Sequence, residues 1–545
     1  QHSTVTQADI ARFVSRNTLD EAQFTAAMAR IMGHPDLVRV GTDRQGRERF
    51  STRQMIAVEA RLAQHAEALA AVEPVKATET PVTSEAAALG SEQKQALAHI
   101  LKPGGLKLVV GYAGTGKSRM LNAARAEWEQ LGLRVRGAAL SGIAAESLER
   151  SSGIASRTLA SLEWAWAKDR EKLEARDVLV IDEAGMTGSR QLERVLRAAS
   201  AVGAKVVMVG DPEQLQSIEA GAAFRYLAER HGAAQLTQIR RQVTPWMQRA
   251  TLELSTGKIS AALDRYDAAG MVHLSATTAE AMAKLVAQWD ADRVANPTRS
   301  QVILAHTRDE VTQLNEMARA CLRARGELGD DKMVQTERGK RTMATGDRVM
   351  FLRNDREMGV KNGTLGVLRG IEDGMLTVQL DDGNKRGAGD LVQVDLRRYA
   401  SIDHGYASTV HKAQGVTVSR SYVMASRGFD RHMTLVAASR HRGRMDLHLS
   451  GEQFKDRAEA GRVLGRARHK DVTLDYASDP ARARMARTAE SVAAQMRGAG
   501  RPNARQPQHG TDREQMIRND KMAQLAKATM RALKLRRERD NDRAR

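Results

Sequence analysis

Residues Gly111 to Ser118 read GYAGTGKS and fit the pattern G-x-x-x-x-G-K-[ST]. The apolar stretch Leu108–Val110 precedes this motif, and a helical pattern, Arg119–Leu131, follows it. A loop between a strand and a helix binds phosphates well, because its N–H groups and the helix N-terminus all point at the anion. The motif therefore predicts a nucleotide-phosphate site within an α/β fold that is built on a parallel sheet.

The chemistry assigns a task to each part of this loop. Lys117 is expected to reach the β- and γ-phosphates, and the Ser118 hydroxyl is expected to ligate Mg²⁺. Upstream, the Gln93 amide both donates and accepts, as an adenine edge requires, although Ser91 could also be a simple helix cap. With ATP and Mg²⁺ as the predicted cofactors, the nucleotide-binding set is Gln93, Gly111, Gly114, Thr115, Gly116, Lys117 and Ser118.

Two further motifs follow apolar strands. Asp182 and Glu183 come directly after Val178–Ile181, and they are predicted to be the Mg²⁺ ligand and the base that deprotonates the attacking water. Gln214 lies in VGDPEQLQ, just past another strand, where a neutral amide could sense the γ-phosphate. The alternative for this last motif is an ordinary turn at Gly210–Pro212.

Arginines in two later motifs are candidates for contacting the γ-phosphate from a second lobe. They are Arg240 or Arg241 in QIRRQ, and Arg440 in VAASRHR. The planar and permanently charged guanidinium suits this task. The paired arginines leave the first position ambiguous by one residue, and any arginine in a chain with 28% charged residues could be there by chance.

Alternating strands and helices mark the two halves of the chain. In the first half we expect strands at Lys107–Gly111, Val135–Leu140, Asp177–Asp182 and Lys205–Gly210, and several of these are continuous apolar runs. A second such unit begins at Gln301–Ala305 and resumes near Gly405. Short strands separated by turns lie between them, at Arg348–Leu352, Gly363–Leu368, Met375–Leu380 and Leu391–Leu396.

The predicted fold class is α/β, with two RecA-like lobes, a small β-barrel insert, an N-terminal winged-helix-like module and a basic C-terminus. The N-terminal module is predicted from helices at Ala8–Ser15 and Glu21–Met32 and a hairpin, and its alternative role is docking. The predicted domains are 1–72 (module), 73–90 (linker), 91–232 (lobe 1), 233–300 (connecting helical region), 301–340 with 401–455 (lobe 2), 341–400 (insert) and 456–545 (basic helical to disordered region).

Charge indicates a polyanionic partner. The net charge is +19, and the last 49 residues, with 14 Lys or Arg and 6 Asp or Glu, account for only +8 of it. Nucleic acid is the commonest polyanion that such a chain meets. No apolar run is long enough to span a membrane, and the single cysteine, Cys321, fits a reducing cytoplasm. Because the chain begins at Gln1 rather than Met, we expect a fragment of a longer polypeptide or a processed product.

The motifs GYAGTGKS, DEAGM, GDPEQL, IRRQ, VHKAQG and VAASRHR occur in the order seen in superfamily 1 helicases. The chain resembles the RecD-like class and, more closely, the helicase half of TraA-type conjugative relaxases. RGAALSGIAAESL, near residues 136–148, and RFSTRQMIAVEARL in the N-terminal module fit that group as well. The resemblance covers roughly residues 1–455 and implies an ATP-driven DNA helicase with 5′→3′ travel.

The resemblance also implies roles by position. Gln93 resembles the adenine-reading glutamine, Arg241 and Arg440 look like the two arginine fingers, and residues 341–400 resemble an SH3-like insert. The residues that resemble phosphate-holding contacts to the DNA strand are Ser141, Thr158, Thr307, Thr409 and His411. The implied partners are single-stranded DNA, a duplex fork, a relaxase domain and conjugative secretion or coupling proteins. The chain departs from the TraA pattern because it has no metal-binding histidine cluster, so we expect no strand-nicking nuclease within it.

Other functions stay open at this point. A P-loop ATPase that remodels proteins is disfavoured by QIRRQ and VHKAQG, which indicate a second lobe. A DNA-binding scaffold with an inactive P-loop is disfavoured by the intact Lys117 and Glu183. A RecD-like helicase of recombination or repair is the nearest alternative to conjugation. Trp164 and Trp166 could stack on bases, but core packing is the favoured interpretation.

Overall fold

The computed structural model describes residues 2–72, 83–215, 220–381, 390–467 and 470–476. All of them belong to one unit, residues 1–483. Most of the predicted linker and most of the predicted C-terminal region lie outside the described residues.

The first lobe is a six-stranded parallel sheet. The strand order is β6 (Ser156–Thr158), β5 (Arg134–Ala139), β7 (Asp177–Ile181), β8 (Lys205–Gly210), β4 (Leu106–Gly111) and β9 (Ala234–Leu236). Successive residues of one strand enter different cores: Leu108 packs into one and Val109 into the other. A sheet that is buried on both faces needs continuous apolar strands, which is the pattern that predicted it.

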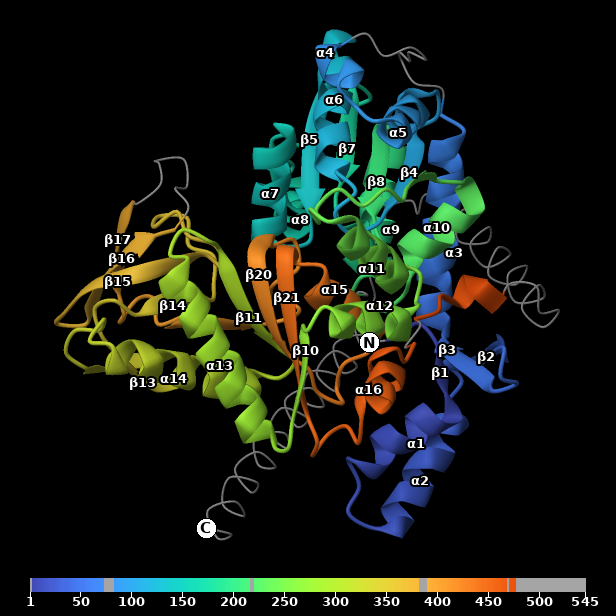
Figure 1. The fold of residues 1–545 in the computed structure, drawn as a ribbon. Helices are drawn as coiled ribbons and strands as arrows, with labels where there is room; N and C mark the ends of the chain where they lie inside the picture. Colours follow the sequence, from blue (N-terminus) through green and yellow to red (C-terminus); the bar gives the residue numbers. More distant parts are fainter. Residues whose placement is uncertain (1, 73–82, 216–219, 382–389, 468–469, 477–545) are drawn as a thin grey trace, which may run out of the picture. The chain divides into compact units, whose positions relative to one another are not determined.

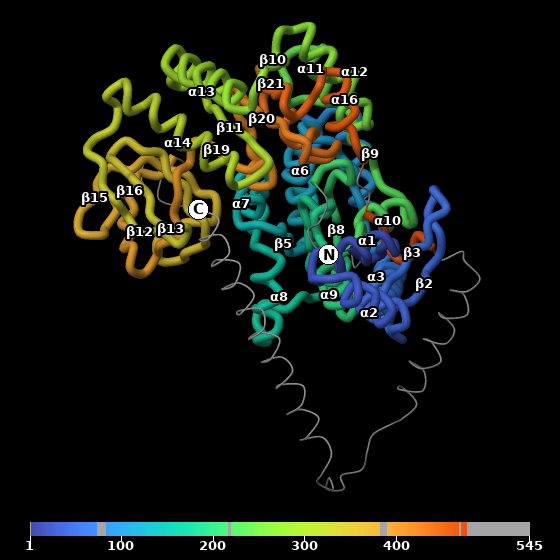
Figure 2. Tube along the Cα trace, turned by 90° about the horizontal axis from the view of Figure 1, so that it is seen from below, coloured from blue at the N-terminus to red at the C-terminus, as the bar shows by residue number. Residues whose placement is uncertain are grey.

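Helices cover both faces of this sheet. One core contains residues of α5 (Ser91–Leu101), α6 (Lys117–Gln130) and α7 (Gly142–Ser152). The other contains residues of α3 (Arg53–Ala70), α8 (Leu159–Ala167), α9 (Ser189–Val202) and α10 (Ala223–His231). Figure 2 shows α6 on one side of the strands and α9 and α3 on the other. The sheet therefore presents the carboxyl ends of its strands, where the motifs lie, at one edge.

The second lobe is also a parallel sheet between helices (Figure 1). Its order is β10 (Val272–Ser275), β21 (His441–Ser450), β20 (Val418–Met424), β11 (Gln301–Ala305) and β19 (Ala407–Thr409). One face packs on α11 (Pro245–Ser255), α12 (Ile259–Ala268), α15 (Arg431–Ala438) and α16 (Arg457–Leu464). The other face packs on α13 (Thr278–Ala295) and α14 (Arg308–Ala324).

Residues 233–300, expected to be a connecting helical region, differ from that expectation. β9 is the edge strand of the first sheet, and β10 is the edge strand of the second, paired in parallel with β21. Helices α11 and α12 contribute Met247, Leu254 and Tyr266 to the core of the second lobe. Most of this segment is therefore part of the second lobe, and the chain crosses between the sheets just after Leu236.

The insert is an antiparallel β structure, and its short strands separated by turns predicted a β insert. Its sheet has the order β17 (Leu391–Asp395), β16 (Met375–Leu380), β15 (Leu365–Glu372), β14 (Arg348–Phe351) and β18 (Ile402–His404). A separate hairpin, β12 (Lys332–Thr336) and β13 (Gly339–Met343), adds Val334 and Met343 to the same core. The insert thus begins before residue 341 and ends after residue 400.

The N-terminal module contains β1 (Val5–Thr6), α1 (Gln7–Ser15), α2 (Glu21–Met32), β2 (Leu37–Thr42) and β3 (Glu48–Thr52). The strands form a three-stranded sheet in the order β1, β3, β2, and α3 leaves it to pack on the first lobe. A short helix, α4 (Ser84–Ala87), precedes α5. The buried Glu59 carboxylate of α3 accepts hydrogen bonds from Ser3, Ser189 and Thr473, so it ties the module to α9 and to the turn η2 (Thr473–Tyr476). Within the part of the chain that the structure describes, every helix is too short or too polar to cross a bilayer.

Acid is expected to destabilise the second lobe through His448. This side chain is 1% exposed, and burial, aided by the charge of His273, lowers its pKa to about 3. A histidine whose folded pKa is depressed stabilises the fold above its unfolded pKa, and that contribution is lost as the pH falls from about 6.5 towards 3. Between pH 6.5 and 5 the loss should be about 2 kcal/mol of unfolding free energy. Urea unfolding of wild type and His448→Gln at both pH values measures it, and identical pH dependence in the two chains would contradict the assignment.

Candidate functional site

The phosphate-binding loop lies between β4 and α6, as its sequence predicted. Gly114 and Gly116 adopt the left-handed region, with φ of +82° and +83°, and Gly116 is the N-cap of α6. A Cβ at Gly114 would lie 2.6 Å from the Arg241 Cβ, so only glycine fits there without a shift. The Lys117 ammonium donates to the carbonyls of Gly111 (2.8 Å) and Tyr112 (3.4 Å), which holds it against the concave side of its own loop.

Gln93 contacts the loop rather than standing apart from it. Its side chain is 1% exposed, and its Nε2 donates to the carbonyls of Thr115 (3.2 Å) and Gly116 (3.0 Å). Its Oε1 accepts from the N–H of Gly90, the N-cap of α5. The amide thus braces the phosphate loop from behind, and its predicted contact with adenine stays a prediction.

Acidic side chains converge beside the lysine. Burial and the neighbouring Glu183 carboxylate raise the pKa of Asp182 to about 6, while the Lys117 charge opposes the shift. Burial likewise raises the pKa of Asp211, which is 3% exposed, to about 6. The Gln214 amide donates to Asp211 at 3.0 Å, and its own Oε1 is buried without a partner in the described residues. Carboxylates that are costly to ionise, next to an unsatisfied acceptor, fit a divalent cation and a hydrated phosphate group.

Glu183 has an unusual backbone conformation. Its φ is +51° and its ψ is +38°, at the start of the short 3₁₀ turn η1 (Ala184–Met186). A left-handed glutamate costs about 1 kcal/mol or more, and such strain is retained mainly where a side chain must be aimed. The Glu183 N–H also donates to the Asp182 carboxylate at 2.9 Å, so the two acids are fixed relative to each other.

Two arginines, one in the segment between the lobes and one in the second lobe, contact the same residue, Ser439. Arg241 donates through Nη1 to the Ser439 carbonyl at 2.8 Å, and Arg440 donates through Nη2 to the Ser439 Oγ at 2.9 Å. Burial lowers the pKa of Arg241 to about 10, and the Glu183 charge acts against that shift. Arg240 instead donates to Gln238 and lies against Gly90. The structure therefore brings Arg241, and not Arg240, towards the acidic cluster.

Arg440 is a buried cation without a carboxylate partner in the described residues. It is 1% exposed, and its guanidinium donates to the Val436 carbonyl at 2.8 Å and the Val416 carbonyl at 3.5 Å. Burial and the Arg241 charge lower its pKa to about 9, against the pull of Glu183 and Asp211. A buried, uncompensated charge is expensive. Its retention beside the phosphate loop indicates that it meets an anion there.

The segment 237–243 joins the two lobes. On the first lobe, Glu92 accepts from the N–H groups of Thr237 (2.8 Å) and Gln238 (2.9 Å). On the second lobe, Gln242 donates to the His441 carbonyl at 2.9 Å, and the Val243 N–H donates to the Arg442 carbonyl at 3.2 Å. Between these anchors, the N–H groups of Arg240 and Arg241 both donate to the Gly114 carbonyl. The predicted phosphate loop and the predicted finger arginine, Arg241, are therefore in direct backbone contact.

The predicted strand-contacting residues occupy helix N-termini. Ser141, Thr158 and Thr307 are the N-caps of α7, α8 and α14, and each hydroxyl accepts an N–H from the first turn of its helix. The hydroxyl proton of each cap is still available to a phosphate oxygen, at the end of the helix that attracts anions. Thr409 ends β19, and His411 follows two residues later. Burial and the nearby His306 lower the pKa of His411.

Sequence reasoning missed two residues of the cluster and was wrong about one tryptophan outside it. Nothing in the sequence marks Ser439, which holds both arginines, and Asp211 was treated only as part of a turn. Core packing was wrong for Trp164, which is 54% exposed, whereas Trp166 packs against the first-lobe core. In the described ranges, no three His, Cys, Asp or Glu side chains are grouped to hold a metal ion by themselves.

Several proteins are similar in sequence to most of this chain. Residues 88–277 match the AAA domain family. The conjugal transfer protein TraA of Agrobacterium fabrum is 40% identical over 488 residues, which are 87% of this chain and 44% of that protein. The predicted resemblance to TraA-type, RecD-like proteins is therefore confirmed. The chain spans less than half the length of the TraA proteins that it matches.

More distant matches include proteins named as DNA helicases. The ATP-dependent RecD2 DNA helicase of Deinococcus radiodurans is 29% identical over 333 residues, which are 60% of this chain and 44% of that protein. Among solved structures, a Pif1 helicase from Bacteroides with ADP-AlF3 and single-stranded DNA is 20% identical, with a TM-score of 0.45, over 67% of this chain and 94% of that one. The names of these relatives, ATP-dependent DNA helicases and an AAA domain, agree with the predicted enzyme class.

Proposed function

We propose that this chain is an ATP-dependent translocase on single-stranded DNA and a helicase that travels 5′→3′. The observation that carries the proposal is one cluster in which Lys117, Asp182 and Glu183 of the first lobe meet Arg241 and Arg440 from the other side. A P-loop, a metal ligand, a base and two arginine fingers are the parts that a phosphoryl-transfer motor requires.

The chemistry of these residues fits Mg²⁺-ATP. The bound nucleotide would supply the γ-phosphate that is transferred to water. Lys117 and the glycine-rich loop would bind the phosphates, and Ser118 and Asp182 would ligate the metal ion. Glu183 would take the proton of the attacking water, and Gln214 would orient that water through its free oxygen. Arg241 and Arg440 would stabilise the charge that develops on the transferred group.

The joint between the lobes would couple this chemistry to movement. The Gly114 carbonyl holds the backbone of Arg240 and Arg241, so a shift of the phosphate loop would move the finger segment directly. We expect the three N-cap hydroxyls, with Thr409 and His411, to grip strand phosphates on the two lobes in turn. Because phosphate contacts carry no base information, binding should be largely independent of sequence.

The finer architecture is part of the same proposal. We assign the antiparallel insert to the SH3-like type and the N-terminal module to the winged-helix type, from their strand order and helix–helix–hairpin sequence. Two RecA-like lobes remain our description of the parallel sheets. The module would contact DNA or dock a neighbouring domain.

The biological setting that we propose is conjugative plasmid DNA transfer, supported by the TraA relatives. The proposed partners are single-stranded DNA, a fork, a relaxase domain and secretion or coupling proteins, and the relaxase chemistry would reside outside these 545 residues. The RecD2 similarity favours a second candidate, a helicase of recombination or repair. A plasmid-transfer assay with the chain deleted distinguishes the two settings.

Polarity is tested by strand displacement on partial duplexes with either a 5′ or a 3′ single-stranded tail. We expect unwinding of the 5′-tailed substrate only, together with ATP turnover that rises strongly when single-stranded DNA is added. A preference for the 3′ tail would show that the proposed polarity is wrong but would leave the translocase proposal intact. No stimulation of turnover by DNA would remove the translocase proposal altogether.

A further inference from the structure

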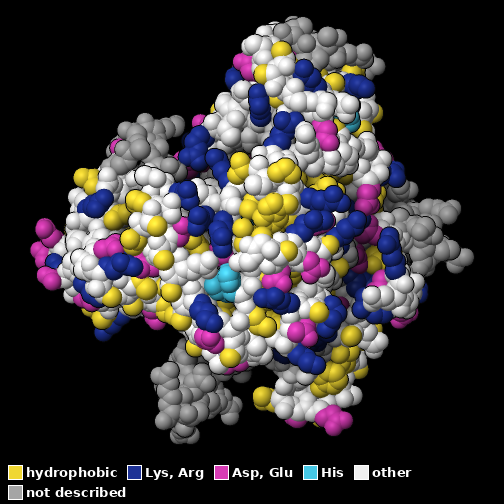
Figure 3. All heavy atoms as spheres, viewed as in Figure 1, with side chains coloured by type: hydrophobic (Ala, Val, Ile, Leu, Met, Phe, Trp, Pro, Cys, Tyr) yellow, Lys and Arg dark blue, Asp and Glu magenta, His cyan; other side chains and the backbone are white. Residues whose placement is uncertain are grey.

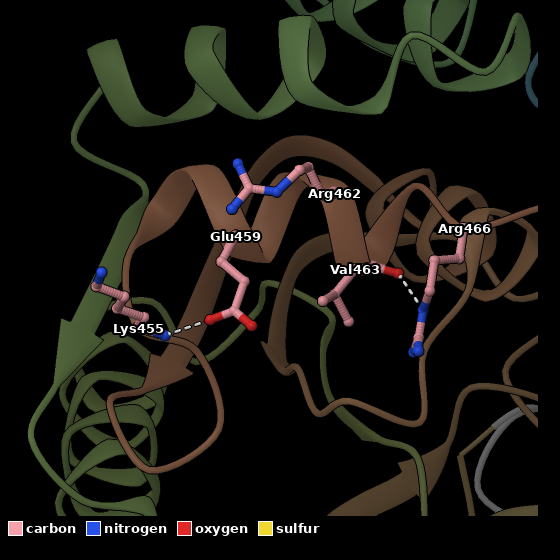
Figure 4. Close-up of a pocket in the computed structure, with 5 residues that line it drawn as sticks. All are labelled: Lys455, Glu459, Arg462, Val463 and Arg466. Atoms are coloured by element: carbon pink, nitrogen blue, oxygen red, sulfur yellow. Dashed lines mark hydrogen bonds between the residues drawn. The ribbon is translucent and has the colours of Figure 1, made fainter.

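A charged groove lies beside α16 on the second lobe. It encloses about 600 Å³ and is lined by Lys455, Glu459, Arg462, Val463 and Arg466, which we call the α16 groove. In Figure 4, Glu459 lies between Lys455 on one side and Arg466 on the other, and Arg462 extends above it. Val463 forms an apolar part of the wall.

The cations of the groove are not neutralised by its one carboxylate. Glu459 already pairs with Arg427 at 3.0 Å and accepts the Lys455 backbone N–H at 2.7 Å. In the portion of the chain that the structure describes, no carboxylate lies within ion-pair distance of the side chains of Lys455, Arg462 or Arg466. By contrast Arg457, on the same helix, pairs with Asp267 at 2.7 Å.

This lack of pairing sets the groove apart from the rest of a basic surface. Figure 3 shows Lys and Arg side chains over much of the visible face, with Asp and Glu between them. A cation that faces a carboxylate has little attraction left for a ligand, so the abundance of cations alone indicates nothing. Three unpaired cations around a hollow with an apolar wall give a concentrated positive potential.

The groove adjoins the predicted strand site of the second lobe. Arg466 donates through Nη2 to the Phe429 carbonyl at 3.2 Å, and also to the Arg427 carbonyl. The same loop also contacts His306, since the Phe429 and His306 ring centroids are 6.1 Å apart. His306 directly precedes Thr307, a predicted phosphate contact. One loop, residues 425–430, therefore contacts both a residue that lines the groove and the residue that precedes Thr307.

We infer that the α16 groove binds backbone phosphates of the single strand beyond the contacts made by Thr307, Thr409 and His411, and so lengthens the strand path on the second lobe. The inference rests on the proposed function. Lys455 and Arg462 would contact the phosphates, whereas Arg466, which donates to loop carbonyls, positions the loop between the two sites. Such contacts are electrostatic and release counterions, so their signature is salt dependence.

The test compares two oligodeoxythymidylates by fluorescence anisotropy over a series of salt concentrations. The short one is the smallest that saturates DNA-stimulated ATP turnover, and the long one extends past it. The variant is Lys455→Ala with Arg462→Ala. The matched control is Arg249→Ala with Lys284→Ala, which removes two exposed cations of α11 and α13, far from the groove in sequence.

For the groove variant we expect the salt slope on the long strand to fall by about 0.7 for each lost phosphate contact, with affinity at low salt reduced on the order of 10-fold. Binding and turnover with the short strand should equal wild type, and the control should be unchanged on both strands. An unchanged long-strand slope, or equal losses on both strands, would overturn the inference and leave the translocase proposal intact. Polyglutamate serves as a second probe, for an acidic protein partner. A groove variant that loses polyglutamate binding but keeps the long-strand salt slope would also overturn the inference. Absence of DNA-stimulated turnover in the wild-type chain would remove both proposals.

Discussion

Arg440→Ala and Arg241→Ala are each expected to lower DNA-stimulated ATP turnover on the order of 10³-fold or more. Both guanidiniums are held by Ser439, one by its carbonyl and the other by its hydroxyl, so they act as a pair with a fixed spacing. The affinity for ATP should fall much less than turnover, because a finger arginine contributes mainly in the transition state. Steady-state turnover at saturating single-stranded DNA measures the effect.

Arg240→Ala is the matched control, since it removes the same charge one residue away. Its guanidinium donates to Gln238 and lies against Gly90, so its loss should cost much less. Arg440→Lys separates charge from geometry, because it keeps the cation and loses the planar fork that reaches Val436 and Ser439. We expect it to be nearly as impaired as the alanine variant. An inactive Arg240→Ala beside an active Arg241→Ala would shift the finger by one residue.

Loss of folding must be distinguished from loss of catalysis for Arg440, because truncating a buried arginine leaves carbonyls without donors. Unfolding free energy and strand affinity without nucleotide provide that check. Arg440→Ala should bind single-stranded DNA close to the wild-type level if its lobe stays folded. If Arg241→Ala and Arg440→Ala both kept DNA-stimulated ATP turnover, the model in which both lobes sense the γ-phosphate would be wrong.

Local patterns in the sequence predicted the central strands of the fold. Residues 178–181 and 206–209 are continuous apolar runs because both faces of their sheet are covered, and such a run predicts a buried strand. The four-residue β10 was not predicted: VHLS alternates apolar and polar residues, but four residues are too few to identify a strand, and this one pairs with β21, far along the chain. The length of the connecting region was therefore overestimated.

The site shows the same division between local and distant information. Motifs predicted the chemistry of Lys117, Asp182 and Glu183, because those residue types at those spacings have few other uses. The contacts of Ser439 with Arg241, and of Gly114 with the finger backbone, depend on segments more than a hundred residues apart. No local pattern reports such contacts. The engagement of Gln93 with the loop carbonyls is similarly a result of tertiary packing.

Glu183→Gln is expected to lower ATP turnover by about 10²- to 10⁴-fold while ATP affinity stays within a few-fold of wild type. Glutamine has the same shape and no comparable basicity, so it removes the proton acceptor without opening a cavity. The backbone effect cancels in this comparison, because a glutamine at φ +51° should be strained about as much as the glutamate. With ATP present, the variant should remain on single-stranded DNA much longer than wild type.

Asp182→Asn is the control that tells a base from a metal ligand. Burial opposes the ionisation of Asp182, and a bound Mg²⁺ would offset that cost. The Asp182→Asn variant should therefore lose Mg²⁺-dependent ATP affinity as well as turnover. Glu183→Gln should thus change turnover alone, whereas Asp182→Asn should also weaken nucleotide binding. Equilibrium binding of a fluorescent ATP analogue with and without Mg²⁺ measures the difference. A collapse of nucleotide affinity in Glu183→Gln would reassign Glu183 to the metal or to folding, and the left-handed turn would then serve the loop and not the attacking water.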